Sequence, residues 1–192
     1  MSNGEPDTIS DEQLAARAQA GDTEAFGMLV ERYEKKLLRY ARRFLSDPED
    51  GTDLVQDVFI KAYENLRSFD ATRRFSPWIY RIAHNEFVNA LKKRAARRTI
   101  FTIDFDTLFP NLAADEQADS VALDRDIRAT IDRYLDQLDA KYREPLILYY
   151  LEEMDYRAIA DVLRIPISTV GVRLSRAKSA LQKLAQHGKE LL

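Results

Sequence analysis

The chain has 192 residues, of which 45% are hydrophobic and 32% charged, and its formal net charge is −3. It has no cysteine and only two histidines, which excludes a disulfide framework, a zinc centre and redox sensing, so we expect no metal and no cofactor. The acidic, polar start is not a signal peptide and no apolar run approaches the ~18 residues of a membrane span, so a cytoplasmic protein is expected. Six glycines and six prolines leave little room for a sheet with many tight turns, and this favours helices.

The charges are unevenly distributed along the chain. Residues 70–98 carry eight cations against two acids, a net +6, and residues 164–189 carry six cations and no acid, again +6. Residues 104–139, between them, carry ten acids against three cations, a net −7. Two basic segments separated by an acidic one indicate two nucleic-acid contacts on one chain.

Three amphipathic helices are predicted first. Ser10 and Gln13 have the spacing of a capping box, for a helix that ends near Gly21. A long second helix stops at residues 47–48, where Asp precedes Pro, and a third runs from about residue 53 to 66. The apolar stripe of the second helix consists of Phe26, Leu29, Val30, Tyr33, Leu37, Tyr40, Ala41 and Phe44. The outward side of the third helix carries Asp53, Gln56, Asp57 and Lys61.

The fourth predicted helix, within residues 73–98, combines aromatic and cationic side chains. Ser76 is expected to cap it and Pro77 to open it. Its apolar stripe consists of Trp78, Ile79, Ile82, Ala83, Phe87, Ala90 and Leu91, and its opposite side of Arg74, Arg81, Asn85, Asn89, Lys92 and Lys93. The cations can neutralise phosphates, while Phe75, Tyr80 and the edge of Trp78 can stack on an unpaired base. An ordinary amphipathic helix with a solvated basic face fits this stretch equally well.

The second half begins with residues 99–119, which break the helical pattern and are predicted to form an acidic, partly apolar linker. A helix follows through Ile127, Ile131, Tyr134, Leu135 and Leu138, and another from about residue 144 to 151. Asp155 then caps a short helix, residues 164–166 form a tight turn, and a second helix carries no acid. This pattern predicts a helix-turn-helix that binds DNA, with a plain helical hairpin as the alternative.

Four motifs occur in a specific order and spacing: DLVQDVF at residues 53–59, FSPWIYRIAHN at 75–85, YRAIA at 156–160 and IPISTV at 165–170. On these motifs the chain resembles the extracytoplasmic-function sigma factors, the small promoter-recognition subunits of bacterial RNA polymerase. The likeness covers nearly the whole chain. It implies an all-α fold with two small helical domains: region two, a four-helix bundle over residues 8–98, and region four, a helix-turn-helix over 120–187, joined by the linker.

The resemblance also implies partners and roles for the outward residues. The partners would be core RNA polymerase, promoter DNA and an anti-sigma factor, and the chain would not be an enzyme. The core polymerase-binding residues would be Asp53, Gln56, Asp57 and Lys61. The residues that read and open the downstream promoter element would be Arg73, Arg74, Phe75, Trp78, Tyr80, Arg81, Asn85, Asn89, Lys92 and Lys93. The residues that bind the upstream element would be Ser168, Thr169, Gly171, Val172, Arg173, Ser175, Arg176 and Lys178.

Some positions depart from the family pattern. Ala158 stands where the family usually has Glu, so the capping box is lost and Asp155 must cap alone. Gly171 and Val172 stand where a Lys–Ser pair is usual, and Asn89 where Asp is common. The outward face of the second helix of the motif is therefore small and nearly uncharged, so hydroxyls, a Val172 contact to a thymine methyl and groove shape must supply most of its specificity.

Two other functions are alternatives for this sequence. A helix-turn-helix regulator that acts without polymerase docking would bind duplex DNA tightly by itself and would not need the outward Asp53, Gln56 and Asp57. A phosphohydrolase-like helical enzyme would need convergent ligands, for which only Asp53, Asp57 and His84 are candidates. For the sigma factor, we expect the linker to set the spacing of the two basic surfaces until polymerase fixes it.

Overall fold

The computed structural model describes residues 9–45, 48–98, 134–135 and 137–189. Every regular element within these ranges is a helix, which confirms the predicted all-α class. The expected linker at 99–119 and the expected helix through Ile127 and Ile131 lie outside the described residues. In the part that is described, no helix combines the length and the apolar character needed to cross a membrane.

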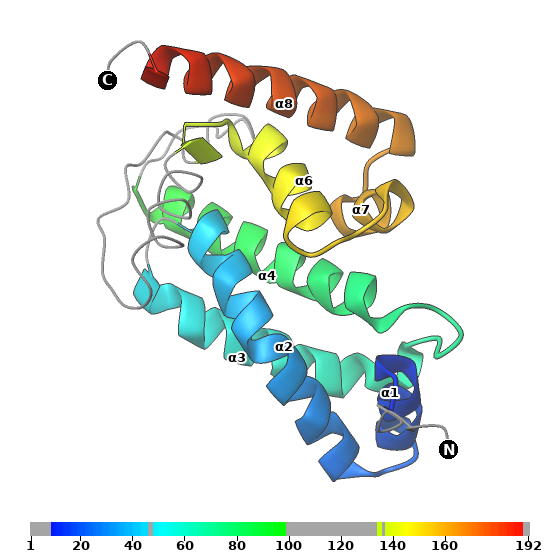
Figure 1. The fold of residues 1–192 in the computed structure, drawn as a ribbon. Coiled ribbons are helices and arrows are strands. Elements are labelled where there is room, and N and C mark those ends of the chain that lie inside the picture. Colours follow the sequence, from blue (N-terminus) through cyan, green and yellow to red (C-terminus); the bar gives the residue numbers. More distant parts are fainter. Residues whose placement is uncertain (1–8, 46–47, 99–133, 136, 190–192) are drawn as a thin grey trace, which may run out of the picture.

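The first four α-helices, with one short 3-10 helix, form what we call the N-terminal bundle (Figure 1). It consists of α1 (Asp11–Gln19), α2 (Thr23–Phe44), α3 (Pro48–Asn65), the short 3-10 helix η1 (Leu66–Ser68) and α4 (Phe75–Arg98). The capping box on α1 is confirmed, because the Ser10 hydroxyl accepts the Gln13 N–H and the Gln13 side chain accepts the Ser10 N–H. Gly21 has φ +102°, a left-handed conformation that suits glycine and lets the chain turn from α1 into α2.

Two helix starts differ from the sequence prediction. Helix α3 begins at Pro48, five residues earlier than expected, because proline at the first helical position needs no N–H partner. Helix α4 begins at Phe75, so Ser76 and Pro77 lie inside its first turn instead of at its cap. The Phe75 N–H, which the helix cannot pair, donates to the carboxylate of Glu12 on α1 at 3.0 Å.

The last three helices form the C-terminal unit: α6 (Ala140–Tyr150), α7 (Tyr156–Leu163) and α8 (Ile167–Lys189). Helices α7 and α8 make the predicted helix-turn-helix. Asp155 caps α7 alone, as expected, by accepting the Ala158 N–H at 2.8 Å. Arg164 takes the left-handed conformation at the end of α7, with φ 53°, and so allows the sharp turn into α8.

The two halves pack directly against each other. Figure 1 shows α4 between α2 and α3 on one side and the C-terminal unit on the other, with α8 as the outermost layer. Helix α4 contacts α7, and α2 contacts α6. Tyr40 of α2 and Tyr80 of α4 are completely buried where the halves meet. The two basic surfaces are thus placed by a packed contact, and not by the linker alone as the sequence suggested.

Candidate functional site

The outer side of α3 presents a row of polar side chains. Asp53 is exposed, and so are Gln56 and Asp57 one helical turn further along the same side, while Val55 and Val58 are buried in the bundle. Lys61, at the end of the row, is exposed but pairs with Glu86 of α4 at 2.5 Å. The structure therefore brings the four residues expected to bind polymerase onto one surface, the α3 row.

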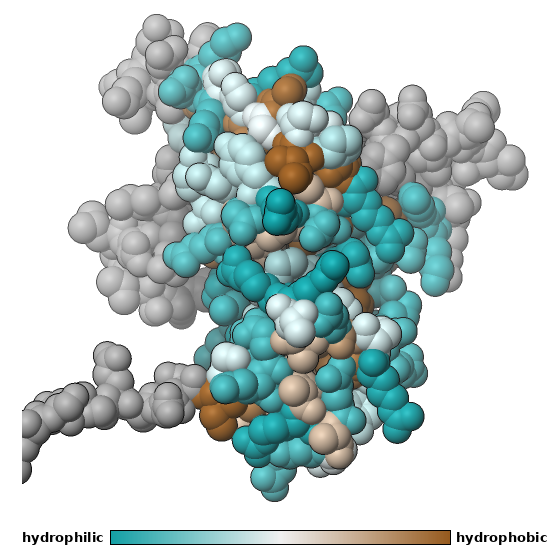
Figure 2. All heavy atoms as spheres, turned by 90° about the vertical axis from the view of Figure 1, so that its right-hand side faces the viewer, coloured by the Kyte–Doolittle hydropathy of each residue, from teal (hydrophilic) through white to brown (hydrophobic). Residues whose placement is uncertain are grey.

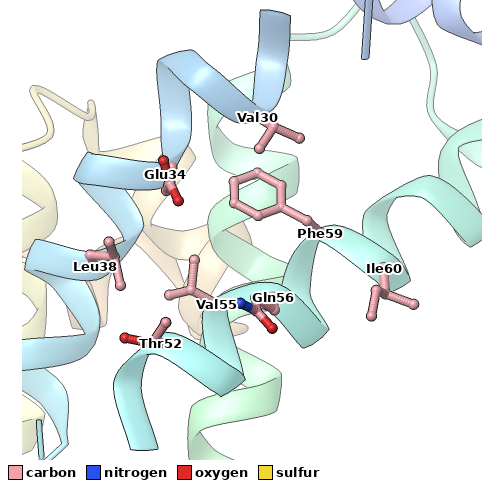
Figure 3. A pocket seen from close by; sticks show the side chains of 8 residues that line it. All are labelled: Val30, Glu34, Leu38, Thr52, Val55, Gln56, Phe59 and Ile60. Carbon is pink, nitrogen blue, oxygen red and sulfur yellow. The ribbon is translucent and has the colours of Figure 1, made fainter. Parts of the chain in front are cut away.

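A hollow of about 360 Å³ lies beside this row, between α2 and α3 (Figure 3). In Figure 3 the Phe59 ring points from α3 toward Val30 of α2, and Gln56 of the α3 row lies at the edge. Ile60, also on this rim, is 55% exposed. The lining residues are Val30, Glu34, Leu38, Thr52, Val55, Gln56, Phe59 and Ile60. This hollow was not predicted from the sequence, although Phe59 and Ile60 indicate it, because they are apolar residues next to the buried Val58 that the bundle does not fully cover.

Two aromatic residues of α4 that were expected to receive an unpaired base are buried. Phe75 is 1% exposed and lies against Tyr33, Phe69 and Trp78, with ring centroids 5.4 to 5.5 Å apart. Tyr80 is 0% exposed and packs against Tyr40. In this arrangement neither ring can stack on a base, so that expectation is wrong for the packed form. The physical reason is that Phe75 packs inside the N-terminal bundle, whereas Tyr80 lies where α2 and the C-terminal unit both cover α4.

The remaining residues expected to bind downstream DNA lie on the side of α4 that is not covered, or just before the helix. Arg73 and Arg74 are exposed, and each has an acidic neighbour: Arg73 pairs with Asp70 at 3.5 Å and Arg74 with Asp155 at 3.7 Å. Trp78, Arg81 and Asn85 are half-buried, and Asn89, Lys92 and Lys93 are exposed. We call these eight residues the α4 basic face.

Acidic side chains of the C-terminal unit contact α2 and α4. Glu144 of α6 is buried, accepts a hydrogen bond from the Tyr40 hydroxyl and lies 2.7 Å from Nδ1 of His84. Glu152 accepts a hydrogen bond from the Tyr80 hydroxyl. Burial, followed by the charge of the nearby carboxylate, raises the pKa of both tyrosines. These contacts could not be predicted from the sequence, because the paired residues lie 60 to 104 positions apart.

The three candidate ligands of a phosphohydrolase are not brought together. Asp53 and Asp57 are exposed on the outer side of α3, whereas His84 contacts Glu144. Among the described residues, no group of three or more His, Asp or Glu side chains could hold a metal ion.

The outward face of α8 carries small polar side chains and one apolar residue. Ser168 and Ser175 are exposed, and Val172 is 50% exposed. In the upper part of Figure 2, where α7 and α8 meet, hydrophobic atoms are gathered together. The atoms below them are mostly hydrophilic. Val170 and Leu174 on the inner side are buried.

The other expected contacts lie along the edges of this face. Arg176 is exposed, and its guanidinium donates to the Tyr142 hydroxyl of α6 at 3.4 Å. Lys178 lies over the rings of Tyr149 and Tyr150, and a hydrogen bond with Tyr150 raises the pKa of its ammonium group. Thr169, Gly171 and Arg173 are half-buried. The tyrosines thus hold two of the cations beside the outward face of α8.

Two protein-family models match the chain. The model of Sigma-70 region 2 matches residues 29–97, and the model of Sigma-70, region 4 matches residues 128–181. The ECF RNA polymerase sigma factor SigW of Bacillus subtilis is 30% identical, over 87% of this chain and 92% of its own. The RNA polymerase sigma-H factor of Pseudomonas aeruginosa is 35% identical, over 92% of this chain and 94% of its own. The solved structure of CnrH in complex with the cytosolic domain of CnrY has a TM-score of 0.67 and 29% identity, over 92% of this chain and 97% of that one. These matches extend over both halves and do not favour a regulator that acts without polymerase. The chain belongs to the extracytoplasmic-function sigma factors of RNA polymerase.

Proposed function

We propose that this sigma factor, which directs RNA polymerase to promoters, divides its work among three surfaces. The α3 row and the adjoining hollow bind core polymerase. The α4 basic face binds the downstream promoter element while it opens, and the outward face of α8 binds the upstream element. The domains would span residues 8–98 and 120–187, ranges that include the matched segments 29–97 and 128–181.

The observation that carries the docking proposal is the α3 row itself. Asp53, Gln56 and Asp57 are exposed, and they lie beside a hollow with an exposed apolar rim. An apolar recess bordered by polar groups is the usual composition of a protein interface. A partner that fills the hollow would bury Phe59 and Ile60 and place polar groups opposite the row.

The two DNA surfaces are supported by the kinds of residue they contain. Arginine, lysine and asparagine on the α4 basic face can contact phosphates and base edges of an opened strand. Arg176 and Lys178 beside α8 can contact phosphates of duplex DNA, while Val172 and the serines face the groove. We further propose that the chain makes and breaks no covalent bond and that it acts in the cytoplasm, which agrees with its family.

An anti-sigma factor is a further proposed partner. The solved structures that resemble this chain include CnrH with the cytosolic domain of CnrY and the sigma factor RpoE of Bartonella quintana with the anti-sigma factor NepR. The second has a TM-score of 0.66 and 25% identity. The likeness of fold supports regulation of this chain by a protein of the same class.

The docking proposal is tested by replacing Gln56 and Asp57 together with alanine. Because both side chains are exposed, folding should change by no more than ~0.5 kcal/mol for each. Affinity for bacterial core RNA polymerase should fall at least about tenfold, which corresponds to ~1.4 kcal/mol. Glu24→Ala, which removes an exposed acid near the start of α2, serves as the control and should leave affinity unchanged. A folded double variant that binds core polymerase like the wild type would exclude the α3 row as the docking surface.

A further inference from the structure

The outward face of α8 has small, uncharged residues at its centre, although it is proposed to bind DNA. Val172 lies between Ser168 and Ser175 on this face, and Gly171 lies beside it. Hydroxyls and a methyl contact can read base edges, but a stable complex also needs groups that bind the phosphate backbone. The residues on the flanks of α8 therefore decide how firmly the face is held in the groove.

Three tyrosines from α6 and α7 lie along one flank of α8, and we call them the tyrosine ledge. They are Tyr149, Tyr150 and Tyr156. The Tyr149 ring contacts both others, with its centroid 4.8 Å from that of Tyr150 and 5.5 Å from that of Tyr156. Tyr156 reaches α8 itself, because its ring lies 3.7 Å from the position that a Cβ atom on Gly171 would take. The ledge thus connects the end of α6 with the flank of α8.

Lys178 of α8 lies on this ledge. Its Nζ atom is 5.5 Å from the centroid of the Tyr150 ring and 6.0 Å from that of the Tyr149 ring. Lys178 follows Gly171 by about two helical turns, so both residues lie on the flank that faces the tyrosines. The rings attract the ammonium group and hold the flexible lysine side chain in place. Lys178 therefore loses less conformational entropy when it binds a ligand.

Tyr150 and Lys178 remain accessible although they contact each other. Tyr150 is 52% exposed, and Lys178 is exposed as well. The Lys178 ammonium donates a hydrogen bond to the Tyr150 hydroxyl, and an ammonium group has more than one N–H to give. The hydroxyl that accepts this bond can still donate its own O–H. The pair therefore presents a positive charge and a neutral donor side by side, a combination that suits a phosphate group.

We propose that Tyr150 and Lys178 together bind one phosphate of the upstream promoter duplex, while Tyr149 and Tyr156 position the pair beside α8. The duplex lies with its groove on Val172 and its backbone on the tyrosine ledge. In a helix-turn-helix the first helix crosses the DNA backbone, and the ledge lies at the start of that helix, α7. The inference rests on the proposed role of α8 and adds the tyrosines to it.

A double-mutant cycle on the full chain tests the shared phosphate. Tyr150→Phe keeps the ring beside Lys178 and removes the hydroxyl, and Lys178→Ala removes the charge. Affinity for a mixed-sequence duplex of about 20 base pairs is measured from about 50 to 200 mM salt, because phosphate contacts do not depend on sequence. Each variant should weaken binding at least about threefold, and the double variant should be no more than about twofold weaker than Lys178→Ala alone. Lys178→Ala should also lower the salt slope by about one.

Controls separate this role from a purely structural one. Lys35→Ala removes an exposed cation of α2, outside the C-terminal unit, and should leave duplex affinity unchanged. Tyr150→Phe should keep the wild-type unfolding temperature, because an exposed hydroxyl contributes little to the fold. In transcription with core polymerase from a randomised upstream element, Tyr150→Phe should select the same sequences as the wild type, because a phosphate contact carries no sequence information.

The outcomes distinguish the ledge from the proposed function. Wild-type duplex affinity of Tyr150→Phe, or additive losses in the double variant, would overturn the shared phosphate. If Arg176→Ala weakens duplex binding while Tyr150→Phe and Lys178→Ala do not, α8 binds DNA without the ledge. If none of the three variants weakens it, the proposed role of α8 fails as well. If Tyr150→Phe loses affinity for core polymerase and not for the duplex, the ledge binds a protein and the proposal is wrong.

Discussion

Phe75 lies between Arg74 and Trp78 of the α4 basic face in the sequence, yet it belongs to the core of the N-terminal bundle. Its ring is 1% exposed and contacts three other aromatic rings. Phe75→Ala should therefore lower the free energy of unfolding by about 3–5 kcal/mol. Denaturant titration measures this, with Arg74→Ala as an exposed control that should change stability by no more than ~0.5 kcal/mol. If Phe75→Ala is nearly as stable as the wild type, the Phe75 ring is not a core residue and is again a candidate for stacking on a base.

Arg176 and Val172 should affect upstream binding in different ways. Arg176→Ala should weaken binding to every upstream sequence alike and reduce the salt dependence, because a phosphate contact carries no sequence information. Val172→Ala should relax preference at one base pair with a smaller loss of affinity. Transcription from a randomised upstream element, with core polymerase present, provides both profiles. The assignment fails if Arg176→Ala is the variant that changes base preference.

The residues of α4 show what a single sequence can and cannot predict. Helical periodicity correctly placed Ile79 and Ala83 inward and Asn89 and Lys92 outward. It could not show that a second partner, α7, covers the side of α4 that carries Tyr80. A tyrosine is compatible with either environment, since its ring packs and its hydroxyl needs one partner. Only the fold, which brings Glu152 to that hydroxyl, decides between them.

At the scale of an element, α7 depends on a single cap. Asp155→Ala removes the acceptor of the Ala158 N–H and should destabilise the protein by about 1 kcal/mol. A chain of this size should then melt ~2–4 °C lower. Asp155→Asn retains a capping oxygen and should recover most of the loss in a thermal unfolding experiment. If both variants melt like the wild type, the cap does not limit the stability of α7.

Element boundaries were predicted less well than the elements themselves. The start of a helix was predicted correctly where a capping side chain pairs with a backbone N–H a few residues later, as at Ser10 and Asp155. Helix α6 begins at Ala140, ahead of the expected start near residue 144, because Asp139 caps it through the Lys141 N–H. The acidic residues before it offered several possible caps, and tertiary packing selected one of them.

At the scale of the whole molecule, the contact between the halves should respond to pH through Glu152. Burial raises the pKa of this carboxyl above its ordinary 4.5, against the opposing effect of the Tyr80 hydrogen bond and the α2 cations. The folded state thus holds the proton more tightly than the unfolded chain. The contribution of the protonated Glu152 carboxyl to the stability of the fold is fully present below about pH 4.5, and it is lost as the pH rises through the folded-state pKa of this group.

Glu152→Gln, which is neutral at every pH, tests this sign. The amide oxygen can still accept from Tyr80, so the variant should melt at a higher temperature than the wild type at pH 8, and the difference should shrink toward pH 4. Thermal unfolding at the two pH values measures it. A stability difference that grows on acidification would contradict the raised pKa.

We propose that one chain binds core polymerase through α3 and two promoter elements through α4 and α8. The most direct test is transcription by purified bacterial core polymerase, with and without the chain, from a randomised promoter library. Initiation should occur only when the chain is present, from templates that share two separate conserved elements. We also expect loss of this initiation with the Gln56→Ala, Asp57→Ala double variant. Initiation that does not require the chain, or a double variant as active as the wild type, would contradict this proposal.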